Sequence, residues 1–97
     1  MENHTKLCGL IGLATKAGKI VVGTDACLEE MKKGKVSLVI VAEDASSRTK
    51  EIFQKEAEKC HIAIYEILSI EKISKAIGKV NKAVIGIKDK RFFKRND

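Results

Sequence analysis

The segment Val36–Ala42, which reads VSLVIVA, decides the fold. Six of its seven residues are apolar, and four of them are β-branched valine or isoleucine. A strand of this composition has no polar face to turn toward water, so it is typical of the middle of a sheet that helices cover on both sides. The rest of the chain is therefore expected to supply further strands and two layers of helices.

Outward from this strand, helical hydrophobic periods alternate with short apolar runs typical of strands. We predict helices over residues 5–16, 24–33, 47–60 and 69–78, and strands over 19–22, 36–42, 62–67 and 82–87. The predicted N-caps are Thr5, Thr24, a residue within 44–47, and Ser69, while Gly78 ends the fourth helix and Asp89 caps a final turn. This order predicts an α/β fold, a three-layer α/β/α sandwich with a small four-stranded mixed sheet, in a single domain over residues 1–97.

The positive charge is concentrated in the last quarter of the chain. The 97 residues carry a formal net charge of +6. Residues 72–97 hold nine basic and two acidic side chains, whereas residues 1–71 are close to neutral. Such asymmetry favours a polyanionic partner such as nucleic acid, and a merely solvated surface is the alternative.

The cysteines and the hydropathy pattern exclude several classes of protein. Cys8, Cys27 and Cys60 form no C-x-x-C pair and have no histidine at metal-ligand spacing, so we predict free thiols, no metal and no cofactor. Cys27 lies in the first turn of a predicted helix, where a reactive thiolate is conceivable, but a buried, inert thiol is the favoured interpretation. No apolar run is long enough for a membrane span, and residues 1–6 lead into no secretory signal, so we expect a cytoplasmic protein without membrane contact.

The four aromatic residues offer little for base stacking. Phe53 and Tyr65 are predicted to be core residues, so no strand would present an aromatic ring on an open sheet face. Phe92 and Phe93 lie inside the basic segment Asp89–Arg95, where they either stack on bases or anchor the last helix to the sheet.

The segment Lys16–Gly34 places a basic turn, a short strand and Gly23-Thr24 in front of a helix. Unpaired amide groups and positive potential at a helix start suit a phosphate or a base edge, and Gly23 permits close backbone approach. Asp25 adds a carboxylate that can accept hydrogen bonds from a guanine edge. A phosphate or base-edge contact is therefore predicted at this helix start.

Lys16–Gly34 together with VSLVIVAEDAS (Val36–Ser46) resembles the kink-turn RNA-binding superfamily of ribosomal proteins, the L seven Ae family. The resemblance is strongest to its small bacterial YlxQ-type members and extends over nearly the whole chain. It implies a three-layer α/β/α sandwich that reads the tandem sheared G·A pairs of a kink-turn. The implied site has two parts, the start of the second helix and an apolar loop before the fourth helix.

Carried over residue by residue, the resemblance implies an RNA site in this chain. Its members are the matching Lys19, Gly23 and Thr24, then Asp25, the basic Lys33, nearby counter-charge from Lys16, Lys32 and Lys35, and the apolar loop Ile67, Leu68, Ser69 and Ile70. Three positions depart from the family pattern: Asp25 replaces an asparagine, Ala26 a glutamate and Glu29 a lysine. These departures predict weakened recognition of guanine edges and repulsion of phosphate at Glu29.

The sequence therefore predicts a non-catalytic RNA-binding protein, ribosomal or ribosome-associated, that recognises a kink-turn-like or other structured RNA. It is expected to act as a monomer, with structured RNA and the ribosome as partners. The alternative is an α/β protein-interaction module that has lost its base-specific contacts.

Overall fold

The computed structural model describes residues 4–93. Its elements are α1 (His4–Lys16), β1 (Ile20–Val22), α2 (Thr24–Lys32), β2 (Leu38–Val41), α3 (Ser47–Cys60), β3 (Ala63–Glu66), α4 (Ile70–Ile77), β4 (Val84–Ile87) and a final 3-10 turn η1 (Lys90–Phe93). Every predicted helix and strand is present, and most are shorter by one or two residues at an end.

The four strands form one mixed sheet in the order β1-β4-β2-β3. β4 is antiparallel to both of its neighbours, while β2 and β3 are parallel. All four residues of β2 are buried, which confirms that the VSLVIVA segment forms an inner strand with helices over both faces. β1 and β3 are the edge strands.

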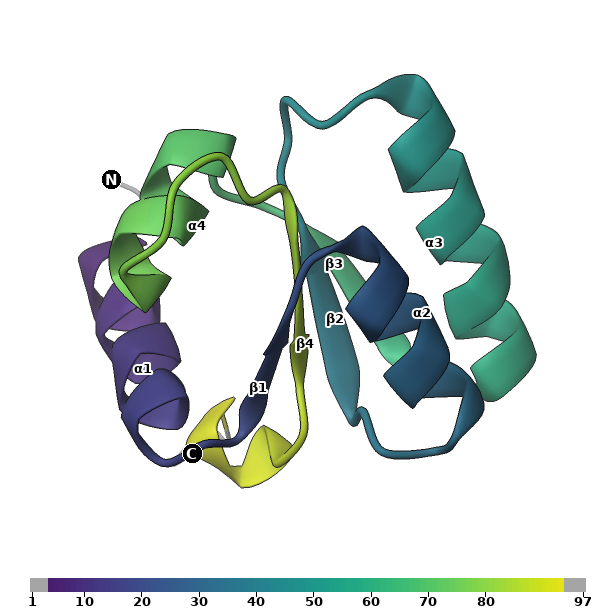
Figure 1. The fold of residues 1–97 in the computed structure, drawn as a ribbon, viewed down its shortest axis with the longest axis horizontal. Coiled ribbons are helices and arrows are strands. Elements are labelled where there is room, and N and C mark those ends of the chain that lie inside the picture. The colour runs from purple at the N-terminus through teal and green to yellow at the C-terminus, as the bar shows by residue number, and fades with distance from the viewer. Residues whose placement is uncertain (1–3, 94–97) are drawn as a thin grey trace.

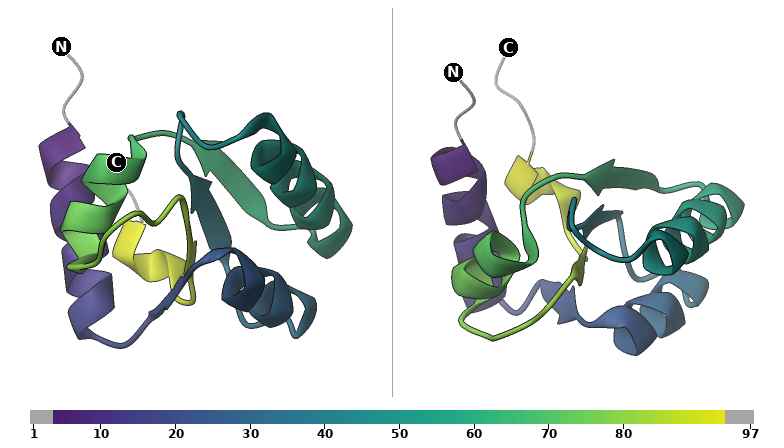
Figure 2. Two further views of the ribbon diagram at one scale, coloured as in Figure 1. Left: turned by 45° about the horizontal axis from the view of Figure 1, so that its top comes forward. Right: turned by 90° about the horizontal axis from the view of Figure 1, so that it is seen from above.

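Helices cover the sheet in two layers, as predicted. α1 and α4 pack together on one face, and α2 and α3 pack together on the other (Figure 1). The view from above shows the three layers side by side, with η1 on the same side as α1 (Figure 2). The α/β/α sandwich is thus confirmed, with a core of Ile, Val and Leu side chains from both faces of the sheet.

The helix caps confirm most of the predicted helix ends and correct two. Ser69 accepts a hydrogen bond from the backbone N–H of Lys72, and Gly78 ends α4 in the left-handed conformation. Thr24 is not a cap, because Gly23 occupies the N-cap position and no side chain caps α2. Thr5 is not a cap either, because α1 begins one residue earlier, at His4.

Tyr65 is not a core residue. Its side chain is 48% exposed on β3, whereas Phe53 is fully buried as predicted. β3 is an edge strand, and the layer of α1 and α4 does not extend over it, so its residues on that face meet solvent. The expectation that no strand presents an exposed aromatic ring was therefore wrong.

The basic segment is described as far as Phe93. Asp89 accepts a hydrogen bond from the Arg91 backbone N–H, which confirms the predicted cap of a final turn. Phe93 is half-buried and packs against the core, so it anchors η1 to the sheet. The Phe92 side chain, Lys94 and Arg95 lie outside the description.

Candidate nucleic-acid interface

The loops of the sandwich gather at two opposite ends of the sheet (Figure 1). We call the end formed by residues 22–25, 42–46, 67–70 and 78–83 the apical end. The end formed by residues 16–19, 32–37, 60–62 and 88–91 is the basal end. Figure 1 shows the apical end at the top and the basal end at the bottom. The predicted RNA site is divided between these two ends.

The start of α2 is the centre of the apical end. Gly23 has φ 99° and ψ 159°, a conformation that is essentially restricted to glycine. Its N–H donates to the Val84 carbonyl at 3.0 Å, which ties the helix start to β4. Within residues 4–93, the amides of Thr24, Asp25 and Ala26 have no hydrogen-bond acceptor. Three unpaired N–H groups at the positive end of a helix suit an anionic or carbonyl oxygen.

The loop between α4 and β4 leads to the same apical end, because β4 pairs with β1 and its Val84 carbonyl accepts a hydrogen bond from the Gly23 N–H. The buried hydroxyl of Ser74 accepts a hydrogen bond from the Lys82 backbone N–H at 2.7 Å and thereby holds this loop. Val80 is 81% exposed, and Lys79 and Asn81 are exposed on either side of it. The sequence prediction missed residues 79–82. The two lysines and the valine after Gly78 were the available signal, but only the strand order brings them to the same end of the sheet as the start of α2.

The second apical loop, residues 67–70, is joined to the loop that follows β2. The Glu43 backbone N–H donates to the Leu68 carbonyl at 2.7 Å, and the Ile70 backbone N–H donates to the Asp44 carboxylate at 2.8 Å. Leu68 has φ 67° and is 1% exposed, so its side chain belongs to the core. Ser69 caps α4, and Ile67 and Ile70 are half-buried. In this loop, Ile67 and Ile70 are the apolar side chains that a ligand can contact.

The three departures from the family pattern differ in their surroundings. Asp25 is exposed and available to a ligand. Ala26 is half-buried and packs against the core. Glu29 is exposed and lies 3.7 Å from the Lys33 ammonium, which is also 3.8 Å from Glu30. The charge of Lys33 is therefore shared with two carboxylates of its own helix.

The structure does not bring the predicted lysines to the start of α2. Lys16 and Lys19 follow α1 and precede β1, and Lys32, Lys33 and Lys35 surround the end of α2. All five stand at the basal end. α2 has nine residues, which at about 1.5 Å per residue separates its two ends by ~13 Å. The predicted site is therefore divided into two separate surfaces, one at each end of the sheet.

Cys27 is a core residue rather than a nucleophile. It is fully buried, and its thiol lies 3.4 Å from the Val21 carbonyl. Burial raises the pKa of this thiol from its ordinary value of 9.0 to about 12. Since the thiolate is the reactive form, Cys27 is inert at neutral pH.

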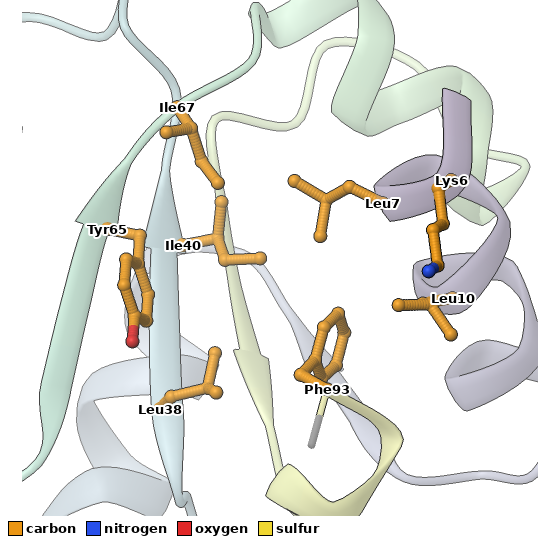
Figure 3. A pocket seen from close by; sticks show the side chains of 8 residues that line it. All are labelled: Lys6, Leu7, Leu10, Leu38, Ile40, Tyr65, Ile67 and Phe93. Carbon is orange, nitrogen blue, oxygen red and sulfur yellow. The ribbon is translucent and has the colours of Figure 1, made fainter. Parts of the chain in front are cut away.

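An apolar groove opens on the face of the sheet that α1 only partly covers (Figure 3). It measures about 310 Å³ and is lined by Lys6, Leu7, Leu10, Leu38, Ile40, Tyr65, Ile67 and Phe93. Tyr65 stands on the β3 side, while the leucines of α1 and Phe93 stand opposite. This groove lies along the strands, apart from the amides of α2.

Residues 4–93 contain neither a membrane-spanning helix nor a three-ligand metal cluster. No helix in this range is long and apolar enough to cross a membrane. The same range holds no group of three His, Cys, Asp or Glu side chains placed to ligate a metal ion.

The model of the ribosomal protein L7Ae/L30e/S12e/Gadd45 family matches residues 5–95. The chain belongs to this family. The membership confirms the resemblance on which the predicted site was built, including its YlxQ-type character.

Two relatives and one solved structure of high similarity illustrate the L7Ae/L30e/S12e/Gadd45 family. The RNA-binding protein YlxQ of Enterococcus faecium is 36% identical over 93 residues, covering 96% of this chain and 89% of the relative. The protein of the same name from Bacillus subtilis is 33% identical over 86 residues, covering 86% and 83%. A Bacillus halodurans protein of unknown function superposes with a TM-score of 0.85 at 30% identity, covering 88% of this chain and 86% of that one.

Proposed function

We propose that this L7Ae-family protein binds structured RNA through its apical end, without catalysis. One observation carries the proposal: the apical end holds both the three unpaired amides at the start of α2 and the loop 79–82, in which Lys79, Val80 and Asn81 are exposed. The amides suit a phosphate or a base edge, and the loop supplies counter-charge and an apolar side chain, Val80, for an unstacked base. Family membership and the RNA-binding names of the relatives support the same function.

The proposed RNA is a kink-turn or a related fold that is held mainly by backbone groups. The family pattern implies an asparagine and a glutamate on guanine edges, where this chain has Asp25 and Ala26. Asp25 accepts hydrogen bonds but offers no amide donor, and Ala26 does neither. Each good bidentate base contact contributes about 1–3 kcal/mol, so losing one or two lowers affinity by roughly 10- to 1,000-fold.

Titration of a fluorescent kink-turn RNA at fixed salt tests this function. The control RNA has its sheared G·A pairs replaced by Watson–Crick pairs. We expect the wild-type protein to bind the kink-turn with modest preference. The double variant Asp25→Asn/Glu29→Lys should bind it at least about tenfold more tightly, because it gains an amide donor and loses a repulsive carboxylate. Binding of the control RNA should rise much less.

Two outcomes contradict the proposal. Absence of RNA binding at low salt removes the RNA function itself. Tight, G·A-dependent binding by the wild-type protein contradicts the weakened recognition assigned to Asp25 and Glu29.

The proposal extends to the setting of this function. We place the protein in the cytoplasm as a single-domain monomer that meets ribosomal or regulatory RNA, on the ribosome or during its assembly. Its three cysteines are unpaired, which fits a reducing compartment.

A protein-interaction module is the second candidate, and the apolar groove favours it. Tyr65 and Phe93 give the groove the aromatic lining that is common at protein interfaces. The dependence of binding affinity on salt concentration distinguishes RNA binding from protein binding. RNA held through several phosphates loses affinity steeply as salt rises, whereas a partner in this groove depends on Tyr65 and is far less sensitive to salt. Tyr65→Ala should leave RNA binding unchanged if the apical end is the RNA site.

A further inference from the structure

The basal end gathers cations from three segments that are far apart in the sequence. Its basic side chains are Lys16, Lys19, Lys32, Lys33, Lys35, Lys88, Lys90 and Arg91. Asp89 lies among them, and the adjoining last turns of α2 and α3 add Glu29, Glu30, Glu56, Glu58 and Lys59. Hydrogen bonds join the segments. The Lys88 backbone N–H donates to the Lys19 carbonyl at 2.8 Å, and the Ser37 hydroxyl donates to the Lys88 carbonyl at 2.9 Å. The cations therefore stand on one connected surface.

Three of these carboxylates, Glu29, Glu30 and Asp89, already have cationic partners. Asp89 pairs with Arg91 at 2.7 Å through two nitrogens of its guanidinium, and this contact holds the pKa of Asp89 at about 2. Glu30 lies 4.0 Å from Lys88 and, like Glu29, contacts Lys33. Asp89 is thus ionised at neutral pH, and its charge is offset locally.

The other five basal cations form no close ion pair, although Lys19 is near enough to Asp89 to help lower the pKa of that carboxyl. Within residues 4–93 they have no carboxylate within 4.0 Å, and all are exposed: Lys16, Lys19, Lys32, Lys35 and Lys90. Like charges gathered in this way repel each other and raise the local positive potential, which attracts polyanions. Ion pairing within the fold therefore does not explain why these five lysines lie together.

The apical end has no such excess. Lys79 and Lys82 are accompanied there by Asp25, Glu43 and Asp44. The surface with the amides and the surface with the free charge are therefore opposite ends of a molecule whose dimensions are 30 × 26 × 24 Å.

We propose that the basal end is a second RNA-binding surface, which holds the phosphate backbone of an RNA segment other than the one at the apical end. Exposed lysines without base-reading partners suit phosphates of any sequence. The protein then joins two RNA segments, one read for shape at the apical end and one held by charge at the basal end. The role of the first segment rests on the proposed function, whereas the basal contact does not.

A two-RNA binding experiment tests this inference. Unlabelled kink-turn RNA is added to saturation, and a fluorescent twelve-residue oligouridine is then titrated and followed by anisotropy over a range of salt concentrations. The basal variant is Lys19→Gln/Lys35→Gln/Lys90→Gln. The matched control, Lys6→Gln/Lys72→Gln/Lys75→Gln, removes the same charge from exposed lysines of α1 and α4. Thermal unfolding of each variant verifies its fold.

We expect oligouridine to bind the wild-type protein that already carries kink-turn RNA. The basal variant should bind it at least about tenfold more weakly at low salt. Its slope of log affinity against log salt should be smaller by ~2, since each phosphate contact to a single strand contributes roughly 0.7. The control variant should differ little from wild type in both measures.

Three results overturn the inference: unchanged oligouridine binding by the basal variant, an equal loss in the control variant, or complete displacement of oligouridine by kink-turn RNA. Failure of the proposed function gives a different result. In that case kink-turn RNA alone shows no binding that depends on the apical residues, while oligouridine binding still depends on Lys19, Lys35 and Lys90.

Discussion

Replacing Gly23 by alanine tests whether backbone geometry at the start of α2 supports both stability and binding. At φ 99° and ψ 159°, a residue with a Cβ atom is strained by about 1–3 kcal/mol. No atom lies within 4 Å of the position that the new Cβ would take, so the penalty is purely conformational. Alanine also lowers the conformational entropy of the unfolded chain, which stabilises the folded variant by roughly 0.4–1 kcal/mol. The difference spans roughly 0–2.6 kcal/mol of unfolding free energy, and we expect a net loss in the middle of this range, about 1–2 kcal/mol.

This loss is large enough to measure by thermal and urea unfolding. For a domain of this size, 1 kcal/mol corresponds to about 4–8 °C in Tm, so Gly23→Ala should lower Tm by roughly 4–16 °C. Gly9→Ala is the matched control, because Gly9 also has no atom near its Cβ position but lies inside helix α1. That change should stabilise the protein by about 0.5–1 kcal/mol. The urea m-value should be the same in both variants.

The reasoning is refuted if Gly23→Ala unfolds at the wild-type temperature or above, or if Gly9→Ala loses as much stability. RNA titration at 10 °C, where both variants are folded, adds a second readout. Gly23→Ala should weaken kink-turn binding because relief of its strain turns the amides of Thr24 and Asp25 away from their present direction. Gly9→Ala should bind as the wild type does.

Three further predictions concern the core around the two ends. Gly86→Ala should destabilise the protein by about 1–3 kcal/mol in urea unfolding, since its new Cβ would lie 3.2 Å from Val36 side-chain atoms. Ser74→Ala should cost about 1–3 kcal/mol by the same measurement, because the Lys82 N–H loses its acceptor, and it should also loosen the 79–82 loop in hydrogen exchange. Cys27 should resist alkylation in the folded protein up to high pH. The unfolded chain releases this thiol proton near pH 9 and the folded one near 12, so stability should fall between these values, and less so in Cys27→Ala.

The fold was readable from the sequence because each element carried its own local signal. The all-apolar VSLVIVA run identified β2 as an inner strand, and serine and glycine marked both ends of α4. The two wrong caps show the limit of such signals. Thr24 follows a glycine whose backbone conformation itself begins the helix, so a good capping residue stood one position too late. Local residue preference does not reveal which of two neighbours takes the non-helical geometry.

Tyr65 and the loop 79–82 could not be located from the sequence because strand order decides their surroundings. The segment Ala63–Glu66 has the composition of a covered strand, and only its place at the sheet edge exposes the tyrosine. The 79–82 loop follows α4 in the chain, yet it leads to the same end of the sheet as the start of α2, because β4 inserts between β1 and β2. Non-local pairing of this kind has no counterpart in short-range patterns.

Sequence proximity was equally misleading for charge. Lys19 and Gly23 are four residues apart and were assigned to one site, but β1 carries the chain from the basal to the apical end between them. The excess charge of residues 72–97 is likewise divided, with Lys82 apical and Lys90 basal. We therefore expect discrimination between RNA folds to depend on the apical amides. The slope of log affinity against log salt should depend on the basal lysines. An affinity measured at one salt concentration combines the two, so a variant that loses binding at low salt has not thereby lost recognition. Measuring both quantities for each variant separates the surfaces.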